Sequence, residues 1–176
     1  MATKAELPAR PRDWMSNSLL DGLVALVVGG GSGIGEATAI TLAANGARVA
    51  VADRRKEAAD GVAKKIEADG GEALSLAMDV AVASEIGAGV SELIARFGQL
   101  DIVVNSAGVI FPGSLEDCSL DDWRTSFLVN VEGALLLARA CRICARASPR
   151  RSSTSPPWPV AGAIPTVAPT GRARRR

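Results

Sequence analysis

The amino-acid sequence predicts an α/β fold in which helices cover both faces of a doubly wound parallel sheet. Short apolar runs rich in β-branched residues alternate with longer segments of helical spacing between residues 23 and 141. Crossover segments of this length give right-handed βαβ units, whose strands pair in parallel. We expect four strands and four helices, with the sheet truncated after its fourth strand and the helix that follows.

The first strand and the first helix carry clear signals. Leu23–Val28 (LVALVV) is entirely apolar, which is typical of a central strand in a parallel sheet. The helix is expected to begin at Gly33, and the Asn45-Gly46 pair is its stop signal. Its spacing puts four residues on one side, namely Ile34, Ala37, Thr41 and Ala44.

The same cycle repeats along the rest of the domain. Each further apolar run is followed by a segment with helical spacing, and the turn between the second helix and the third strand reads DGG. The expected strands are Arg48–Asp53, Ala73–Met78 and Leu100–Asn105. The expected helices are Lys56–Ala68, Ser84–Phe97 and a last one from about Leu120 to Cys141.

Charge divides the chain into parts of different character. Residues 1–141 carry twelve basic and nineteen acidic side chains, whereas residues 142–176 carry eight arginines and no Lys, Asp or Glu. We expect an N-terminal extension over residues 1–20 and a nucleotide-binding domain over residues 21–141. Residues 142–176 are a Pro/Arg-rich tail, which its composition predicts to be disordered unless it is encoded out of frame.

Composition also excludes several kinds of site. The chain has no His and no Tyr, so neither side chain can serve as an acid or a base. Cys141 and Cys144 form a C-x-x-C pair, but with Cys118 as the one other cysteine we expect no metal site. No run reaches the length of a membrane span, and no secretory signal is recognisable at the N-terminus. We therefore expect a cytoplasmic protein with no membrane partner.

A glycine-rich turn lies where a parallel sheet binds phosphates. GGGSGIG (Gly29–Gly35) follows the first strand and opens the first helix, so its N–H groups and the helix N-terminus can face a pyrophosphate. The spacing is G-x-x-x-G-x-G, and a merely flexible loop is the alternative interpretation. The residues that we expect to bind the cofactor here are Gly29, Gly31, Ser32, Gly33, Ile34 and Gly35.

An acidic residue ends the second strand, as a dinucleotide site requires. Asp53 follows Gly35 by eighteen positions, and its carboxylate can accept hydrogen bonds from the adenosine ribose. A carboxylate there repels a 2′-phosphate, so NAD is expected rather than NADP. Arg54, which we include in the site, and Arg55 leave NADP open, since a guanidinium can pair with that phosphate. A solvated turn residue is the alternative role for Asp53.

Four motifs in order resemble the short-chain dehydrogenase/reductase family, whose fold is a Rossmann-type sheet. VGGGSGIG is similar to its T-G-x-x-x-G-I-G, with Val28 in place of Thr. MDV resembles its adenine-pocket motif, and NSAG resembles its N-N-A-G at the end of the fourth strand. DDWRTSFLVNVEG is similar to the helix that carries the family's catalytic Asn. The resemblance therefore implicates Asp79, Val80, Asn105, Ala107, Gly108 and the catalytic Asn130.

The resemblance implies an oxidoreductase that interconverts a small-molecule alcohol and carbonyl with NAD(H). In that family a Ser and a Y-x-x-x-K pair follow these motifs, but this chain has no Tyr and its last lysine is Lys65. We therefore expect the chain to be inactive. Homo-oligomers are usual in the family. The alternative is a non-catalytic dinucleotide-binding module, or an interaction protein with a basic tail, although a nucleic-acid partner is disfavoured.

The genetic code offers an explanation for the missing residues. When the third base of each codon is read with the first two of the next, the junction after Ser152 permits VNVASMAG, which resembles the family's strand with the catalytic Ser. The junction of Pro169 and Thr170 permits Tyr, and GASK is permitted after it. Our hypothesis is a frameshift near residues 140–142. A natural Pro/Arg-rich tail is the alternative.

Overall fold

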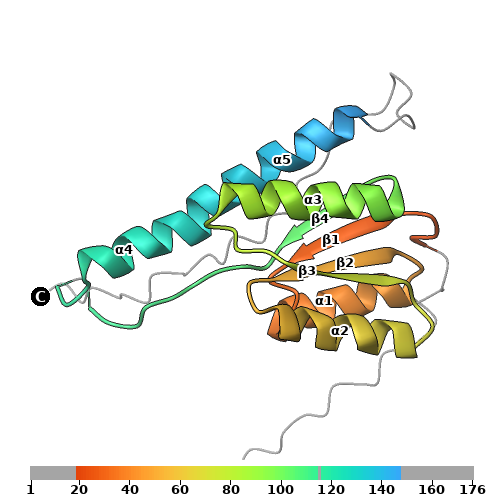
Figure 1. The fold of residues 1–176 in the computed structure, drawn as a ribbon. Coiled ribbons are helices and arrows are strands. Elements are labelled where there is room, and N and C mark those ends of the chain that lie inside the picture. The colour runs from red at the N-terminus through yellow and green to blue at the C-terminus, as the bar shows by residue number, and fades with distance from the viewer. Residues whose placement is uncertain (1–18, 115, 148–176) are drawn as a thin grey trace, which may run out of the picture.

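The computed structural model describes residues 19–114 and 116–147, so the interpretations of residues 1–18 and 148–176 lie outside the described residues. The chain forms one four-stranded sheet with helices on both faces, in the order shown in Figure 1. The strands are β1 (Val24–Val28), β2 (Arg48–Asp53), β3 (Ala73–Ala77) and β4 (Ile102–Asn105). The first three helices are α1 (Gly33–Ala44), α2 (Lys56–Ala68) and α3 (Ala83–Phe97). The last helical stretch comprises α4 (Leu120–Phe127), the π-helical turn η2 (Leu128–Glu132) and α5 (Gly133–Ala147).

All pairs in the sheet are parallel, in the order β3-β2-β1-β4, which confirms the doubly wound α/β class. β1 is central, and every residue of it is buried, as its apolar run predicted. β1 pairs with β2 from Val24 opposite Arg48 and with β4 from Ala25 opposite Ile102. Within the described residues β4 is an edge strand, and all four of its residues are half-buried.

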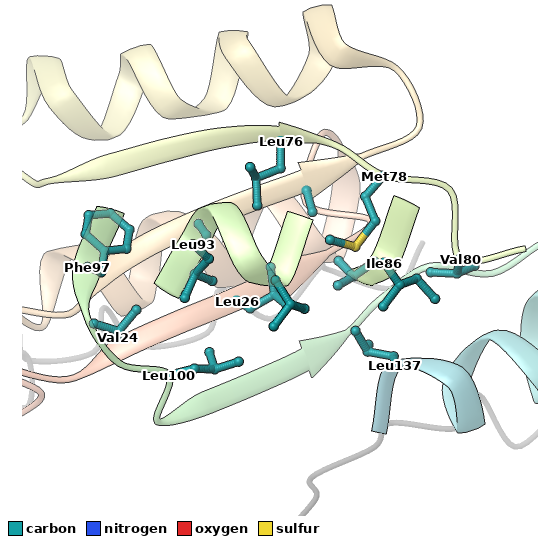
Figure 2. Close-up of a cluster of buried hydrophobic side chains, with 14 residues drawn as sticks. Val24, Leu26, Leu76, Met78, Val80, Ile86, Leu93, Phe97, Leu100 and Leu137 are labelled. Atoms are coloured by element: carbon teal, nitrogen blue, oxygen red, sulfur yellow. The ribbon is translucent and has the colours of Figure 1, made fainter. Parts of the chain in front are cut away.

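Alternate residues of the strands contribute their side chains to two hydrophobic cores, one on each face of the sheet. Val24, Leu26 and Val28 point to the face covered by α3 and α5. Figure 2 shows Val24 and Leu26 with side chains from both helices and from β3. Ala25 and Val27 point to the opposite face, which α1 and α2 cover. The period-two alternation of the strands thus supplies both layers of the fold.

Helix α1 lies on the sheet through its smallest residues. Its buried positions are Gly35 and Ala39. A Cβ on Gly35 would lie 2.0 Å from the Gly29 carbonyl oxygen, so only glycine permits this close approach. The four residues that the spacing put on one side, Ile34, Ala37, Thr41 and Ala44, do share a side, but that side is exposed. Small residues face the sheet because the helix axis lies close to it.

The last helical stretch differs from the single helix expected over Leu120–Cys141. Ser119 begins it, since its Oγ accepts a hydrogen bond from the Asp122 N–H at 3.0 Å. The π-helical turn interrupts it, and α5 continues to Ala147, six residues beyond the expected end. Alanine and arginine favour helix, and they dominate the added segment. Among the described residues, no helix has the length and apolarity to cross a membrane.

Candidate functional site

The loops that follow the four strands are joined at the carboxyl edge of the sheet. The Gly30 N–H donates to the Ala52 carbonyl at 3.0 Å, which links the ends of β1 and β2. The Ser106 N–H donates to the Val28 carbonyl at 2.8 Å, which links β1 and β4. The chain leaves β1 toward β2 on one side and returns to β4 on the other, so this edge is a topological switch point. Open α/β sheets bind their ligands at such a point.

The glycine-rich turn is packed against the loop after β4. Gly29 has φ of 73°, and a Cβ there would lie 2.6 Å from the Ala107 nitrogen. Both facts require glycine, because other residues avoid this backbone conformation and would collide with the opposite loop. The close packing of this turn against the opposite loop favours one defined conformation over the flexible loop that is its alternative interpretation.

The N-terminus of α1 is open toward this turn. Ser32 occupies the N-cap position in an extended conformation, yet its side chain forms no cap hydrogen bond. The first N–H groups of a helix have no partner inside the helix and carry a partial positive charge. Gly33 and Ile34 begin the helix, and Ile34 is 81% exposed. This end of α1 can therefore accept an anionic group of a ligand.

Asp53 lies buried beside the turn, at the end of β2. It is 7% exposed, and its Oδ2 accepts a hydrogen bond from the Gly31 N–H at 3.1 Å. Its Oδ1 accepts from the Arg55 N–H at 3.0 Å. A Cβ on Gly31 would lie 2.7 Å from Oδ2, so glycine is what lets the carboxylate reach the turn. Asp53 is thus held against the glycine-rich turn and is more than a solvated turn residue.

An arginine joins Asp53 to the glycine-rich turn, and it is Arg55. Its Nε lies 3.6 Å from Asp53 Oδ1, and its Nη2 donates to Ser32 Oγ at 3.4 Å. Arg54 is exposed, and in the described part of the chain it forms no ion pair with Asp53. The sequence placed Arg54 in the site, and it left either Arg54 or Arg55 able to pair with a 2′-phosphate. Sequence alone carries no signal for which of two adjacent long side chains turns back over the loop.

The loop after β3 presents Asp79 and Val80. The Ala81 N–H donates to Asp79 Oδ1 at 2.8 Å, which forms a turn. The Asp79 N–H donates to Glu85 Oε2 at 2.8 Å, a contact with α3 that sequence reasoning missed. Val80 is buried against the start of α5, where a Cβ on Gly133 would lie 2.9 Å from the Val80 Cβ. Glycine at this position therefore allows α5 to approach the loop.

The loop after β4 is held from two sides. Asn105 Oδ1 accepts a hydrogen bond from the Ala107 N–H at 3.2 Å. Asn130, in the π-helical turn, bonds twice to Val109: its Oδ1 accepts from the Val109 N–H and its Nδ2 donates to the Val109 carbonyl, both at 2.9 Å. A Cβ on Gly108 would lie 3.3 Å from Asn130 Oδ1. The amide thus fixes the distance between this loop and the last helical stretch. Such π-helical turns are frequent at functional sites.

The structure gathers the candidate residues into one region. The residues taken from the glycine-rich turn and from the ends of β2, β3 and β4 all lie at the carboxyl edge, and Asn130 reaches this edge through Val109. A backbone cradle that side chains would fill, an open helix N-terminus and a buried carboxylate are the features that a dinucleotide requires. Among the described residues no cluster of three or more His, Cys, Asp and Glu could hold a metal ion.

The chain is similar in sequence to a protein family and to named proteins. The family described as short chain dehydrogenase matches residues 23–146. D-threitol dehydrogenase of Mycolicibacterium smegmatis is 42% identical over 121 residues, which are 69% of this chain and 46% of that protein.

Solved structures share the fold. A short chain dehydrogenase of Burkholderia cenocepacia, in complex with NADP, is 40% identical with a TM-score of 0.68, covering 71% of this chain and 51% of that one. A 7α-hydroxysteroid dehydrogenase, complexed with NADH and 7-oxo glycochenodeoxycholic acid, is 35% identical with a TM-score of 0.69, covering 73% of this chain and 51% of that one. The chain spans about half the length of the relatives that it matches.

Proposed function

Because this chain belongs to the short-chain dehydrogenase/reductase family, we propose that it is the cofactor-binding part of an oxidoreductase that interconverts a small-molecule alcohol and carbonyl with NAD(H). The observation that carries the proposal is the buried Asp53 carboxylate, bonded to the Gly31 N–H beside the open N-terminus of α1. This arrangement offers an anion site and a ribose acceptor next to each other.

Each loop has a part in this proposal. The N–H groups from Gly33 to Gly35 face the pyrophosphate, and Asp53 accepts hydrogen bonds from the adenosine ribose. Asp79 and Val80 border the adenine, and the Asn105–Gly108 loop borders the nicotinamide end. The bound cofactor supplies the hydride chemistry, and the chain's own residues bind and orient it. The remaining proposed contacts are those of Gly29, Gly31, Ser32, Ile34 and Arg54.

We favour NAD over NADP as the principal cofactor. A buried carboxylate at the end of β2 repels a 2′-phosphate and satisfies the two ribose hydroxyls of NAD. Related structures contain NADH in one case and NADP in another, so the family likeness is compatible with either. The preference therefore rests on Asp53.

The catalytic step needs more than this chain contains. Asn130 is the proposed catalytic residue that the chain supplies, whereas the family's Tyr and Lys have no counterpart, since there is no Tyr and no Lys after Lys65. We propose that the chain as given binds cofactor without turnover. The frameshift hypothesis accounts for the absence of this Tyr and Lys. The coding DNA tests the hypothesis, because VNVASMAG followed by YGASK must appear in the alternative frame. A stop codon or unrelated residues there would refute it.

A second candidate is a non-catalytic module whose basic tail binds an acidic partner. The eight arginines after Cys141 favour it. Two assays separate the candidates. Oxidation of an alcohol by the chain with its reading frame restored supports the enzyme. Binding to DNA or RNA that weakens steeply with salt, together with no NADH binding, supports the module instead.

We also propose that the chain forms a homo-oligomer through its last helical stretch. One stripe of exposed apolar side chains runs along α4, η2 and α5, and α4 projects away from the sheet (Figure 1). Exposed apolar patches of this kind mark interaction sites. The stripe consists of Leu120, Trp123, Phe127, Leu128, Val131 and Leu135.

A further inference from the structure

We infer that Glu85, in the first turn of α3, is a positioning residue for the base of the cofactor. Its carboxylate holds the Asp79–Val80 loop in the conformation that distinguishes adenine from hypoxanthine. The inference rests on the proposed function, because it concerns the loop that borders the adenine there. Its basis is the hydrogen bond that the Asp79 N–H donates to Glu85 Oε2 at 2.8 Å.

The first step concerns the shape of the loop between β3 and α3. Three groups of Asp79 form hydrogen bonds in this loop. Its Oδ1 accepts from the Ala81 N–H at 2.8 Å, and its carbonyl accepts from the Val82 N–H at 3.0 Å. These two bonds are made within the turn itself, whereas the bond of the Asp79 N–H goes to Glu85. Glu85 therefore supplies the bond that ties the turn to the first turn of the helix.

The second step concerns what fixes Glu85. Val82 is the N-cap residue of α3 and forms no side-chain cap hydrogen bond. A glutamate at the third helical position commonly bonds back to the N-cap N–H, but Glu85 reaches Asp79, three residues before the N-cap. Its neighbour Ile86 and the loop residue Val80 both belong to the core cluster of Figure 2. The carboxylate thus bridges a helix and a loop that the core holds in place.

The third step concerns the groups that the loop leaves unused. In the described part of the chain, Asp79 Oδ2 and the Val80 N–H form no hydrogen bond. The loop therefore offers a carboxylate acceptor and an N–H donor on consecutive residues. Adenine carries an amino donor beside the N1 acceptor, whereas hypoxanthine carries a carbonyl acceptor beside an N1–H donor. The pair is complementary to adenine alone, so selectivity depends on keeping these two groups in place.

Equilibrium binding tests the inference. We would measure Kd by calorimetry for NADH and for its analogue with hypoxanthine in place of adenine, using the full chain and its Glu85→Ala variant. We expect the unaltered chain to bind NADH at least about fivefold more tightly than the analogue. In Glu85→Ala, Kd for NADH should rise about fivefold while Kd for the analogue changes less than about twofold. The preference for adenine is then largely lost.

Two further variants serve as controls. Glu85→Gln keeps an oxygen that can accept from the Asp79 N–H, so it should retain most of the preference. Glu92 is another exposed glutamate of α3, and Glu92→Ala should leave both constants unchanged although it removes the same charge. Hydrogen exchange at the Asp79 N–H, measured without cofactor, should be faster in Glu85→Ala than in Glu85→Gln.

Several results would overturn the inference. Equal weakening of both cofactors in Glu85→Ala would show a merely structural role. Loss of the preference in Glu85→Gln as fully as in Glu85→Ala would assign the effect to charge and not to the hydrogen bond. Equal binding of NADH and its analogue by the unaltered chain would reject the inference and leave the proposed function intact. Binding of neither would reject both. Circular dichroism of each variant verifies that its fold is kept.

Discussion

Gly29 is the residue whose side chain, or lack of one, most directly shapes the site. Its φ of 73° and the 2.6 Å approach that a Cβ would make to Ala107 both oppose substitution. We expect Gly29→Ala to lower the free energy of unfolding by about 2 kcal/mol or more. Gly61→Ala is the matched control: nothing lies within 4 Å of a Cβ there, and in a helix it should gain about 0.5–1 kcal/mol. Urea denaturation measures the free energy of unfolding of both variants. Equal effects of the two substitutions would show that position 29 does not require glycine.

Asp60 gives a pH dependence at the scale of one side chain. Its hydrogen bonds with Lys56 first, and then with Ser75, hold the pKa of this carboxyl below its ordinary value. A pKa that is lower in the folded state than in the unfolded state stabilises the folded protein at pH values above the unfolded pKa of about 3.9. This contribution to stability is lost as the pH falls through the folded pKa.

The matching variant is Asp60→Asn, which cannot ionise. The unaltered chain should melt at a higher temperature than Asp60→Asn at pH 7, and the difference should close as the pH falls below about 4. The difference is expected to be small because Asp60 is exposed to solvent. Thermal melts between pH 3 and 7 measure it, and a gap that widens in acid would show that the sign is wrong.

At the scale of elements, Asn130 connects the loop after β4 to the last helical stretch. Its two hydrogen bonds with Val109 are the contacts that an alanine would remove. We expect Asn130→Ala to lower the free energy of unfolding by about 1–2 kcal/mol and to speed hydrogen exchange at the Val109 N–H. Asn130→Asp keeps the acceptor and should protect this N–H partly. Unchanged exchange in both variants would mean that the loop is held by other contacts.

The helical stretch from Leu120 to Ala147 carries the prediction about assembly. If its exposed stripe joins copies of the chain, a charge in the stripe should weaken association. We expect Trp123→Lys to raise the dimer dissociation constant at least about tenfold, since buried aromatic residues dominate interfaces. Thr125→Lys, an exposed position off the stripe, is the control. Sedimentation equilibrium measures both. Equal effects of the two variants, or a chain that is monomeric at high concentration, would reject the proposed interface.

For the whole molecule, the sequence predicted local features, such as the strands, better than it predicted long-range contacts. The apolar runs located all four strands, and the parallel order followed from the length of the crossovers. The π-helical turn could not be predicted, because its geometry accompanies the pairing of Asn130 with Val109, twenty-one residues apart. The sequence likewise could not predict which side of α1 is exposed, because that helix has small or apolar residues on most sides. The glycine-rich turn and Asp53 were identified from spacing, but the turn of Arg55 toward Ser32 depends on side-chain conformation.

We propose that this chain forms a working dinucleotide site without the residues that complete the reaction. Calorimetric titration of the purified chain with NADH, with Asp53→Ala as the control and an alcohol oxidation assay alongside, tests it most directly. We expect saturable binding that weakens at least about tenfold in Asp53→Ala, because hydrogen bonds to a charged acceptor are lost, and no turnover in either. Absence of binding by a chain that is folded by circular dichroism, or equal binding by both proteins, would contradict the claim.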